Sequence, residues 1–281
     1  QRIEAELLAS SCLGLAGRAG GQELLIGRGH GLRALSLLDI MADSPGECTL
    51  GEISEQAKLP SSTVHRLLTS LIQVGYVTQD PVTNRYGLGN TLIRLSHVAV
   101  RKHNLIRIAR PWLEKMAGQT GETVNLTARF EDSVIQLDHV DSPNMLRVSY
   151  PAGERFPLHA SASGKIFLAY LPQGEFDRFL ARTPEAFTPA TVVKKEDLQF
   201  EIAATRVRGY ALDDAERELG VRCVAAPVFH SLGHVDAAIS ISGPSVRISL
   251  ERLHELAGDL VNVAHEISQA RREPAILPVA G

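Results

Sequence analysis

The sequence predicts an α+β protein of two domains. Its length favours more than one domain, and the order of its secondary-structure patterns and its charge distribution both separate an N-terminal part from the rest. Its 281 residues exceed the usual size of one domain. Three helical patterns and two short strands come first, and groups of strands alternating with helices follow. Residues 28–110 contain ten Lys and Arg against six Asp and Glu, while residues 111–281 contain seventeen against twenty-three. A basic first domain is typical of one that binds nucleic acid.

The first two helices of the N-terminal domain are predicted from periodicity and capping. The segment GLRALSLLDIMA places apolar residues on one face, namely Leu32, Leu35, Leu38 and Met41, with Leu37 beside them. In TLGEISEQAKL, Thr49 precedes Glu52 by three residues, which is the spacing of a capping box. A helix is therefore expected to start at each of these segments.

The third helix follows after only a few residues, in SSTVHRLLTSLIQVGY. We expect Ser61 or Ser62 to cap it and Gly75 to end it, since glycine readily takes a positive φ. So short a turn favours a helix-turn-helix over an antiparallel bundle. The segment YVTQDPVTNRYGL then reads as two strands around a turn at residues 80–84, a hairpin that would form the wing.

The rest of the chain predicts a linker helix and a domain with an antiparallel sheet. A helical period runs through LIRLSHVAVRKH, and another helix follows in LIRIARPWLEKMAGQTG, where Pro111 either kinks the helix or marks its first turn. Strands are expected in ETVNLTARF, SVIQLDHV, LRVSYP, YALDD, CVAAPVFH and VDAAISIS, and helices in KIFLAYL, after Gln173, in EDLQFEIAATRVRG and from Val246 to about Arg271.

These patterns give five segments. Residues 1–29 are expected to form a mobile arm or to be an expression remnant, and residues 273–281 a tail. Between them lie the winged helix-turn-helix (30–89), the linker helix (90–103) and the second domain (104–272).

The front of the third helix is the candidate DNA-reading element, because a recognition helix meets base edges with its N-terminal residues. Arginine can bind guanine through two parallel hydrogen bonds, and hydroxyls can bond to bases or phosphates. Lys58 and Arg85 are expected to contact the phosphate backbone. The alternative is that the serines only cap the helix and the other residues form a solvated face. The candidate readers are Ser61, Ser62, Thr63, His65 and Arg66.

The stretch LGEISEQAKLPSSTVHRLLTSLIQVGYV followed by YGLG resembles the DNA-binding domain of the IclR family of bacterial regulators. Downstream, TGETVNL, FPLHASASGKIFLA, GYALDDAERELGVRCVAAPV and AAISISGP resemble that family's effector domain in order and spacing. The resemblance runs from Gly31 to Arg271. It implies a GAF-like effector domain and homodimers or homotetramers that bind double-stranded operator DNA. It also implies that the protein is a regulator, most often a repressor of a catabolic operon. A small organic acid would control it.

A ligand site is expected where residues 159–164 open a helix, since free N–H groups at a helix N-terminus bind carboxylates. The resemblance implies the individual residues. The ligand would meet the amides of Ala162 and Ser163, then Asp213, Cys223, Ser240 and Ser242, and an apolar wall of Val148, Phe156 and Val221.

Asp213 constrains the ligand, because a carboxylate beside an anionic ligand is repulsive unless one of them is protonated or Asp213 accepts from a ligand hydroxyl. The sequence therefore predicts a hydroxyl, a hydrated carbonyl or an amide beside the acid group of the ligand. The alternative is that Asp213 and Asp214 form a solvated turn and that Ser240 and Ser242 lie on a polar strand face.

An enzyme is the main rival class. Cys223 with His159 could act as nucleophile and base, or Ser161 or Ser163 with Lys165 as a hydrolase pair. Cys223 lies in a strand-like run, and Arg222 is its only positive neighbour there to lower the pKa of the thiol. The sequence therefore predicts that the protein is not an enzyme.

No metal, cofactor or membrane is expected. The ten histidines are scattered without ligand spacing, and no run approaches the roughly 18 apolar residues of a membrane-spanning helix. Glu4 and Glu6 stand where a secretory leader would have a basic region. Cys12, Cys48 and Cys223 lie far apart, which fits a cytoplasmic location, and Cys48 is expected to be a small, semi-buried apolar residue.

Overall fold

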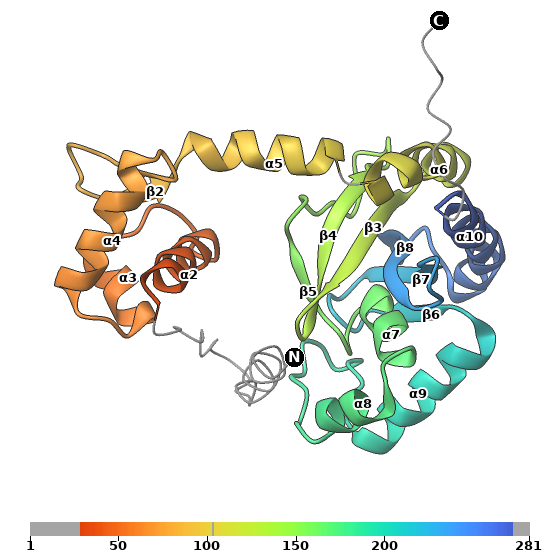
Figure 1. Cartoon of the computed structure of the whole chain (residues 1–281). Coiled ribbons are helices and arrows are strands. Elements are labelled where there is room, and N and C mark those ends of the chain that lie inside the picture. The colour runs from red at the N-terminus through yellow and green to blue at the C-terminus, as the bar shows by residue number, and fades with distance from the viewer. Residues whose placement is uncertain (1–28, 103, 272–281) are drawn as a thin grey trace, which may run out of the picture. The chain divides into compact units, whose positions relative to one another are not determined.

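The computed structural model describes residues 29–102 and 104–271 (Figure 1). The chain divides into two compact units, residues 1–100 and 101–281, and the boundary falls within one helix. The expected arm lies outside the described residues except for Gly29, and the expected tail lies outside them altogether.

The first unit is a winged helix-turn-helix. The buried side chains of its first three helices form one core, which includes Leu37, Ile53 and Leu68. Its two strands form an antiparallel hairpin, and Cys48, which is buried, adds an isolated bridge to Tyr86. Its elements are α2 (His30–Ala42), α3 (Leu50–Ala57), α4 (Ser61–Gln73), β1 (Val77–Gln79), β2 (Tyr86–Leu88) and α5 (Asn90–Lys102), the last of which continues into the second unit.

The helix ends of this unit follow the predicted chemistry in two of three cases. Thr49 and Glu52 form the expected capping box, with bonds of 3.2 and 2.6 Å. Gly75, just beyond α4, has φ +76° as expected. The prediction that Ser61 or Ser62 caps α4 was wrong. Proline fixes φ before the first turn, and Pro60 is the N-cap residue, so both serines are already helical.

The predicted buried face of α2 was partly wrong. Leu38 and Met41 are buried with Leu37, as expected, but Leu32 and Leu35 are 59% and 57% exposed. Leucines occur on more than one side of this helix, so its periodicity alone does not select a face. Packing against α3 and α4 buries the side that carries Leu37 and Met41.

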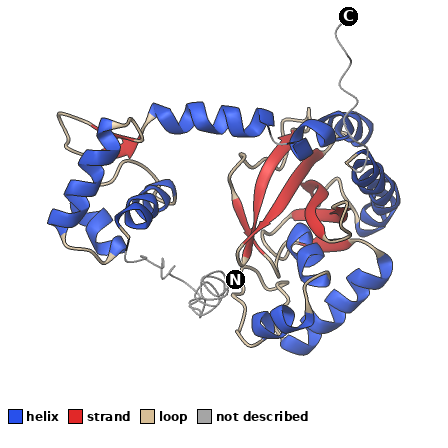
Figure 2. Ribbon diagram, viewed as in Figure 1, coloured by secondary structure: helices blue, strands red, loops and turns tan. Residues whose placement is uncertain are grey.

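The second unit is an α+β domain on a six-stranded antiparallel sheet (Figure 2). The strands lie in the order β5-β4-β3-β8-β7-β6. Its elements are α6 (Asn104–Thr120), β3 (Thr123–Phe130), β4 (Ser133–Val140), β5 (Arg155–Pro157), α7 (Ala162–Ala169), α8 (Gln173–Leu180), α9 (Lys195–Arg208), β6 (Ala211–Asp214), β7 (Val221–Phe229), β8 (Val235–Pro244) and α10 (Leu250–Ala270).

The two faces of the sheet bury different cores, because side chains alternate between faces along a strand. Ile239 and Ile241 of β8 join the core beneath α6 and α10. On the opposite face Ala238 packs in the core formed by α7, α8 and α9, and Ser240 and Ser242 continue that face. The polar residues of β8 therefore lie on the side of the sheet that carries α7.

Three details of this unit differ from expectation or decide between alternatives. Residues 146–151 form no strand, because the backbone of Gln136 in β4 pairs with Gly153 and Glu154 instead. Helix α10 starts at Leu250 rather than Val246, since the hydroxyl of Ser249 caps it. Pro111 lies inside α6 rather than in its first turn. The predicted α+β class and the winged helix-turn-helix are confirmed.

Candidate functional site

Helix α4 presents a polar front to solvent. Its buried stripe is Val64, Leu67, Leu68 and Leu71. The five predicted DNA-reading residues lie off that stripe: Ser61, Ser62, His65 and Arg66 are exposed, and Thr63 is half-buried. The guanidinium of Arg66 is 3.2 Å from the imidazole Nε2 of His30, a residue of α2 that the sequence reasoning did not select.

The two residues predicted to contact phosphates differ in the contacts that their side chains make within the protein. Lys58 is exposed and has φ +50°, because it closes α3 in the left-handed conformation. Arg85, beside the wing hairpin, donates to the carbonyl of Glu47 at 2.6 Å and lies 3.7 Å from the carboxylate of Glu52. Arg85 therefore helps to hold the hairpin against the start of α3, with its guanidinium still half-exposed.

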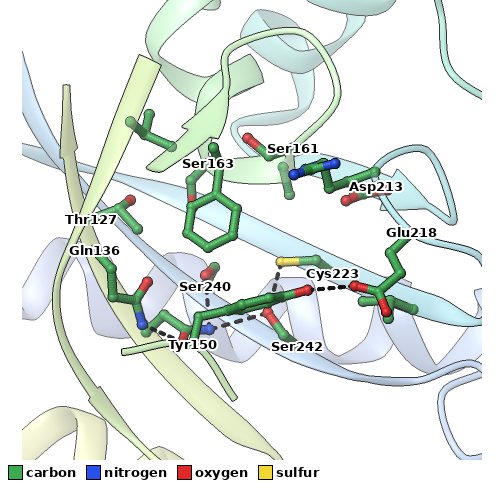
Figure 3. Close-up of a pocket in the computed structure, with 16 residues that line it drawn as sticks. Thr127, Gln136, Tyr150, Ser161, Ser163, Asp213, Glu218, Cys223, Ser240 and Ser242 are labelled. Carbon is green, nitrogen blue, oxygen red and sulfur yellow. Dashed lines mark hydrogen bonds between the residues drawn. The ribbon is translucent and has the colours of Figure 1, made fainter. Parts of the chain in front are cut away.

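Eight of the nine residues predicted for the ligand site line a single pocket in the second unit (Figure 3). The pocket contains about 490 Å³ of space that protein atoms do not fill, its open mouth included. Val148 is the exception: it is buried but does not line the pocket. The eight are Phe156, Ala162, Ser163, Asp213, Val221, Cys223, Ser240 and Ser242.

The N-terminus of α7 opens into this pocket. Ser161 caps the helix, and its Oγ accepts from the amide of Gly164 at 3.1 Å. The first amides of a helix have no acceptor within the helix. The amides of Ala162 and Ser163 are thus in position to donate to an anion, with the helix dipole in their favour.

The floor of the pocket is a connected set of hydrogen bonds (Figure 3). Gln136 Nε2 donates to Asn125 Oδ1 at 2.8 Å, and Asn125 Nδ2 donates to Ser242 Oγ at 3.1 Å and to Ser240 Oγ at 3.4 Å. Ser242 in turn donates to the sulfur of Cys223 at 3.2 Å. These side chains are buried or nearly so, and mutual bonding holds the hydroxyls in fixed positions.

Asp213 is buried at the end of β6, and burial raises the pKa of its carboxyl to about 7. The amide of Glu216 donates to its Oδ1 at 2.8 Å and partly offsets that rise, whereas the charge of Glu216 adds to it. A carboxyl with this pKa is half protonated near neutral pH. The repulsion expected between Asp213 and an acidic ligand is correspondingly reduced.

Cys223 and His159 lie in environments that do not favour nucleophilic chemistry. Burial raises the pKa of the Cys223 thiol to about 12, so the thiol stays neutral at physiological pH. Burial lowers the pKa of His159, whose Nε2 donates to the carbonyl of Glu185 at 2.8 Å. The imidazole stacks on Phe187.

Sequence reasoning missed half of the pocket lining. A signal was available for Asn125, Thr127 and Gln136, whose amide and hydroxyl groups alternate with apolar residues along β3 and β4. None was available for the loop residues, whose position depends on the whole fold. Ser161 lies in the segment 159–164 that was predicted to open the site, but it was not named as a contact. The other residues not predicted are Asn125, Thr127, Val134, Gln136, Tyr150, Arg217 and Glu218.

Two features of the described chain bear on other classes of site. Across residues 29–102 and 104–271, no cluster of three His, Cys, Asp or Glu side chains could hold a metal ion. In those same ranges no helix has both the length and the apolar character to cross a membrane.

A winged helix-turn-helix joined to an α+β domain with a polar pocket defines a class of protein, the DNA-binding transcriptional regulators. Comparison with known families agrees. The IclR helix-turn-helix domain matches residues 32–81, and the bacterial transcriptional regulator IclR C-terminal domain matches residues 97–269.

Individual relatives match over most of their length. The chain is 38% identical over 241 residues to the transcriptional repressor IclR of Escherichia coli K12, covering 85% of this chain and 88% of that protein. A crystal structure of an IclR transcriptional regulator from Alicyclobacillus acidocaldarius is similar with a TM-score of 0.79 and 28% identity, covering 86% and 98% of the two chains. An IclR homologue from Microbacterium hydrocarbonoxydans complexed with 4-hydroxybenzoate has a TM-score of 0.74 at 25% identity, covering 87% and 99%.

The chain belongs to the IclR family and is a DNA-binding transcriptional regulator. Members of this family are regulators rather than enzymes, which removes the hydrolase alternative built on Cys223 and His159.

Proposed function

We propose that the protein is a repressor that binds a palindromic operator as a homodimer or homotetramer and is released by a small organic acid. In this proposal residues 30–89 bind DNA, residues 90–103 connect the domains, and residues 104–272 bind the acid. Such a protein acts in the cytoplasm, where its operator is. The observation that carries the proposal is the pocket, where the α7 N-terminus and the buried Asp213 meet the hydroxyls of β8.

The acid would be held by two of its groups, the carboxylate and the polar group on the neighbouring carbon. The amides of Ala162 and Ser163 would donate to the carboxylate. Asp213 would bond to a hydroxyl or hydrated carbonyl beside it, and Ser240 and Ser242 would complete the contacts from β8. Phe156 and Val221 would cover the apolar part. The relative bound to 4-hydroxybenzoate supports a carboxylic acid as the class of ligand.

Control of DNA binding would follow from a shift between two arrangements of the assembled protein. A ligand changes such an equilibrium only by binding one arrangement more tightly than the other. The acid would favour the arrangement in which the two α4 helices no longer match successive major grooves, and the operator would be released.

Ser242→Ala tests this proposal. The variant removes a hydroxyl that the pocket network orients, and we expect acid affinity to fall about tenfold with operator affinity unchanged. Ser231→Ala, at the exposed turn of the same β7–β8 hairpin, is the matched control. A thermal-shift screen of small organic acids, followed by operator release measured by fluorescence anisotropy, provides the readout. Normal induction of Ser242→Ala would place the acid elsewhere.

A further inference from the structure

The pocket is lined by one arginine, Arg217. Of the other half-buried arginines of this unit, three are each paired with a carboxylate at 2.6 Å, namely Arg208, Arg222 and Arg271, and a fourth, Arg155, lies over the ring of Phe130. Arg217 is half-buried and forms no such ion pair within the described part of the chain. Arg217 instead lines the pocket.

The guanidinium is held in place by an aromatic stack. Its central carbon lies 4.4 Å from the ring centre of Phe187, a cation–π contact. Phe187 in turn stacks on His159, with 5.8 Å between ring centres. An arginine fixed in this way loses little side-chain freedom when it binds an anion.

The backbone that carries Arg217 is also anchored. Thr188 Oγ1 donates to the carbonyl of Ala215 at 2.7 Å, and Thr191 Oγ1 donates to that of Glu216 at 2.6 Å. The next residue, Glu218, accepts from the hydroxyl of Tyr150 at 3.0 Å, so its carboxylate is already engaged. Among the residues that line the pocket, Arg217 is the one arginine or lysine, and its guanidinium is therefore the side chain there that can pair with an anion.

The pocket therefore has two groups suited to anions, the first amides of α7 and the guanidinium of Arg217. Arginine and carboxylate match each other in geometry and form strong, often bidentate hydrogen bonds. A monocarboxylic acid would use only one of these two groups. We infer that the effector is a short dicarboxylic acid, with one carboxylate on the amides of Ala162 and Ser163 and the other on Arg217. This inference rests on the proposed function and names the class of its ligand.

Matched acids that differ in one carboxylate test the inference on the full chain. The pairs are succinate with butyrate, and malate with 2-hydroxybutyrate, each of four carbons. Isothermal titration should give tighter binding of the dicarboxylate by about tenfold in at least one pair. Arg217→Gln should reduce that preference to within about twofold, and Arg217→Lys should retain part of it because the charge remains.

The controls separate this inference from simple loss of structure. Arg178→Gln removes an exposed arginine of α8 and should leave the preference intact. Unfolding of unliganded Arg217→Gln should stay close to that of the wild type, and its operator affinity should not change. A preference that survives in Arg217→Gln, or equal binding of both members of each pair, would overturn the inference and leave the proposed function standing. If no acid of either kind binds or releases operator DNA, both fail.

Discussion

The front of α4 and the pocket under α7 use the same kinds of polar side chain in opposite ways. On α4, Ser61, Ser62 and His65 project into solvent from a helix whose other side is packed. In the pocket, Asn125 and Ser242 are buried and bonded to each other. Exposed groups cost nothing to the fold and gain a role only when a partner arrives, whereas buried groups must be satisfied before any ligand binds.

This difference teaches where function and stability are coupled. A change on the face of α4 should alter binding of DNA and little else. A change to one of the buried, mutually bonded side chains of the pocket should alter ligand binding and the stability of the second unit together, because the same bonds serve both. The changes below test this contrast from the largest expected effect to the smallest.

Gly164→Ala should damage the pocket and its unit most. A Cβ at this position would lie 2.4 Å from the carbonyl oxygen of Leu158, and backbone cannot easily move away. We expect a loss of about 3 kcal/mol in the free energy of unfolding. Fluorescence of Trp112, the single tryptophan, reports on the second unit during urea unfolding.

Gly118→Ala in α6 is the control for that change, because nothing lies within 4 Å of its added Cβ. It should stabilise the same unit by up to about 1 kcal/mol. Equal urea unfolding midpoints for the two variants would show that the close approach of α7 to Leu158 does not contribute to the stability of this unit.

Arg66→Ala should weaken operator binding by about tenfold to a hundredfold, because a bidentate contact to guanine is worth about 1–3 kcal/mol. Thermal stability and the shift caused by an acid should remain as in the wild type. Fluorescence anisotropy with labelled operator measures operator binding. Differential scanning fluorimetry measures the thermal stability and the shift caused by an acid. Arg178→Ala, which removes the same charge from the second unit, should bind operator normally; equal losses in both variants would reduce Arg66 to a nonspecific charge.

The carboxyl of Asp213 should make acid binding depend on pH. Its pKa of about 7 means that it gains charge as pH rises, and its repulsion of an anionic ligand grows. Between pH 6 and 8 acid affinity should fall about tenfold in the wild type and stay flat in Asp213→Asn. Titration calorimetry across this range provides the measurement, and parallel pH profiles would exclude Asp213 from contact with the ligand.

The same shift has a consequence for stability, and its sign follows from linkage. Because burial raises the pKa of Asp213 in the folded state, folding binds a proton between about pH 4 and 7. The contribution of this group is greatest at acidic pH and is lost as pH rises through about 7. Asp213→Asn should flatten that part of the pH profile of unfolding.

Thr49→Ala should have the smallest effect of the series. It removes the capping box of α3 and should cost about 1 kcal/mol, confined to the first unit. Hydrogen exchange of the Glu52 amide should accelerate, and the Trp112 transition should not move. A shift of that transition would mean that the stabilities of the two units are coupled.

Most features that depend on neighbouring residues were predictable from sequence, the N-cap of α4 at Pro60 excepted, and those that depend on the whole fold were not. The capping box of Thr49 and Glu52 is a four-residue pattern, and it forms as expected. The buried face of α2 was partly mistaken because Leu32 and Leu35 are as apolar as Leu37, and only packing against α3 and α4 distinguishes them.

The pocket follows the same rule. Strand ends such as Asp213 and Cys223 were placed in it through resemblance to a family, since no local pattern joins β6, β7 and the start of α7. Asn125 could have been found from its place between Val124 and Leu126 in a strand. Tyr150 and Arg217 come from loops, and periodicity carries no information about where a loop places its side chains.

Acid affinity measured with and without saturating operator tests the central claim, that one acid controls DNA binding from the pocket of the second unit. Coupling between two sites is reciprocal, so the factor by which the acid weakens operator binding must equal the factor by which operator weakens acid binding. We expect the acid to bind less tightly to the operator complex, by that same factor. Identical acid affinities for the free and the DNA-bound protein would contradict the account.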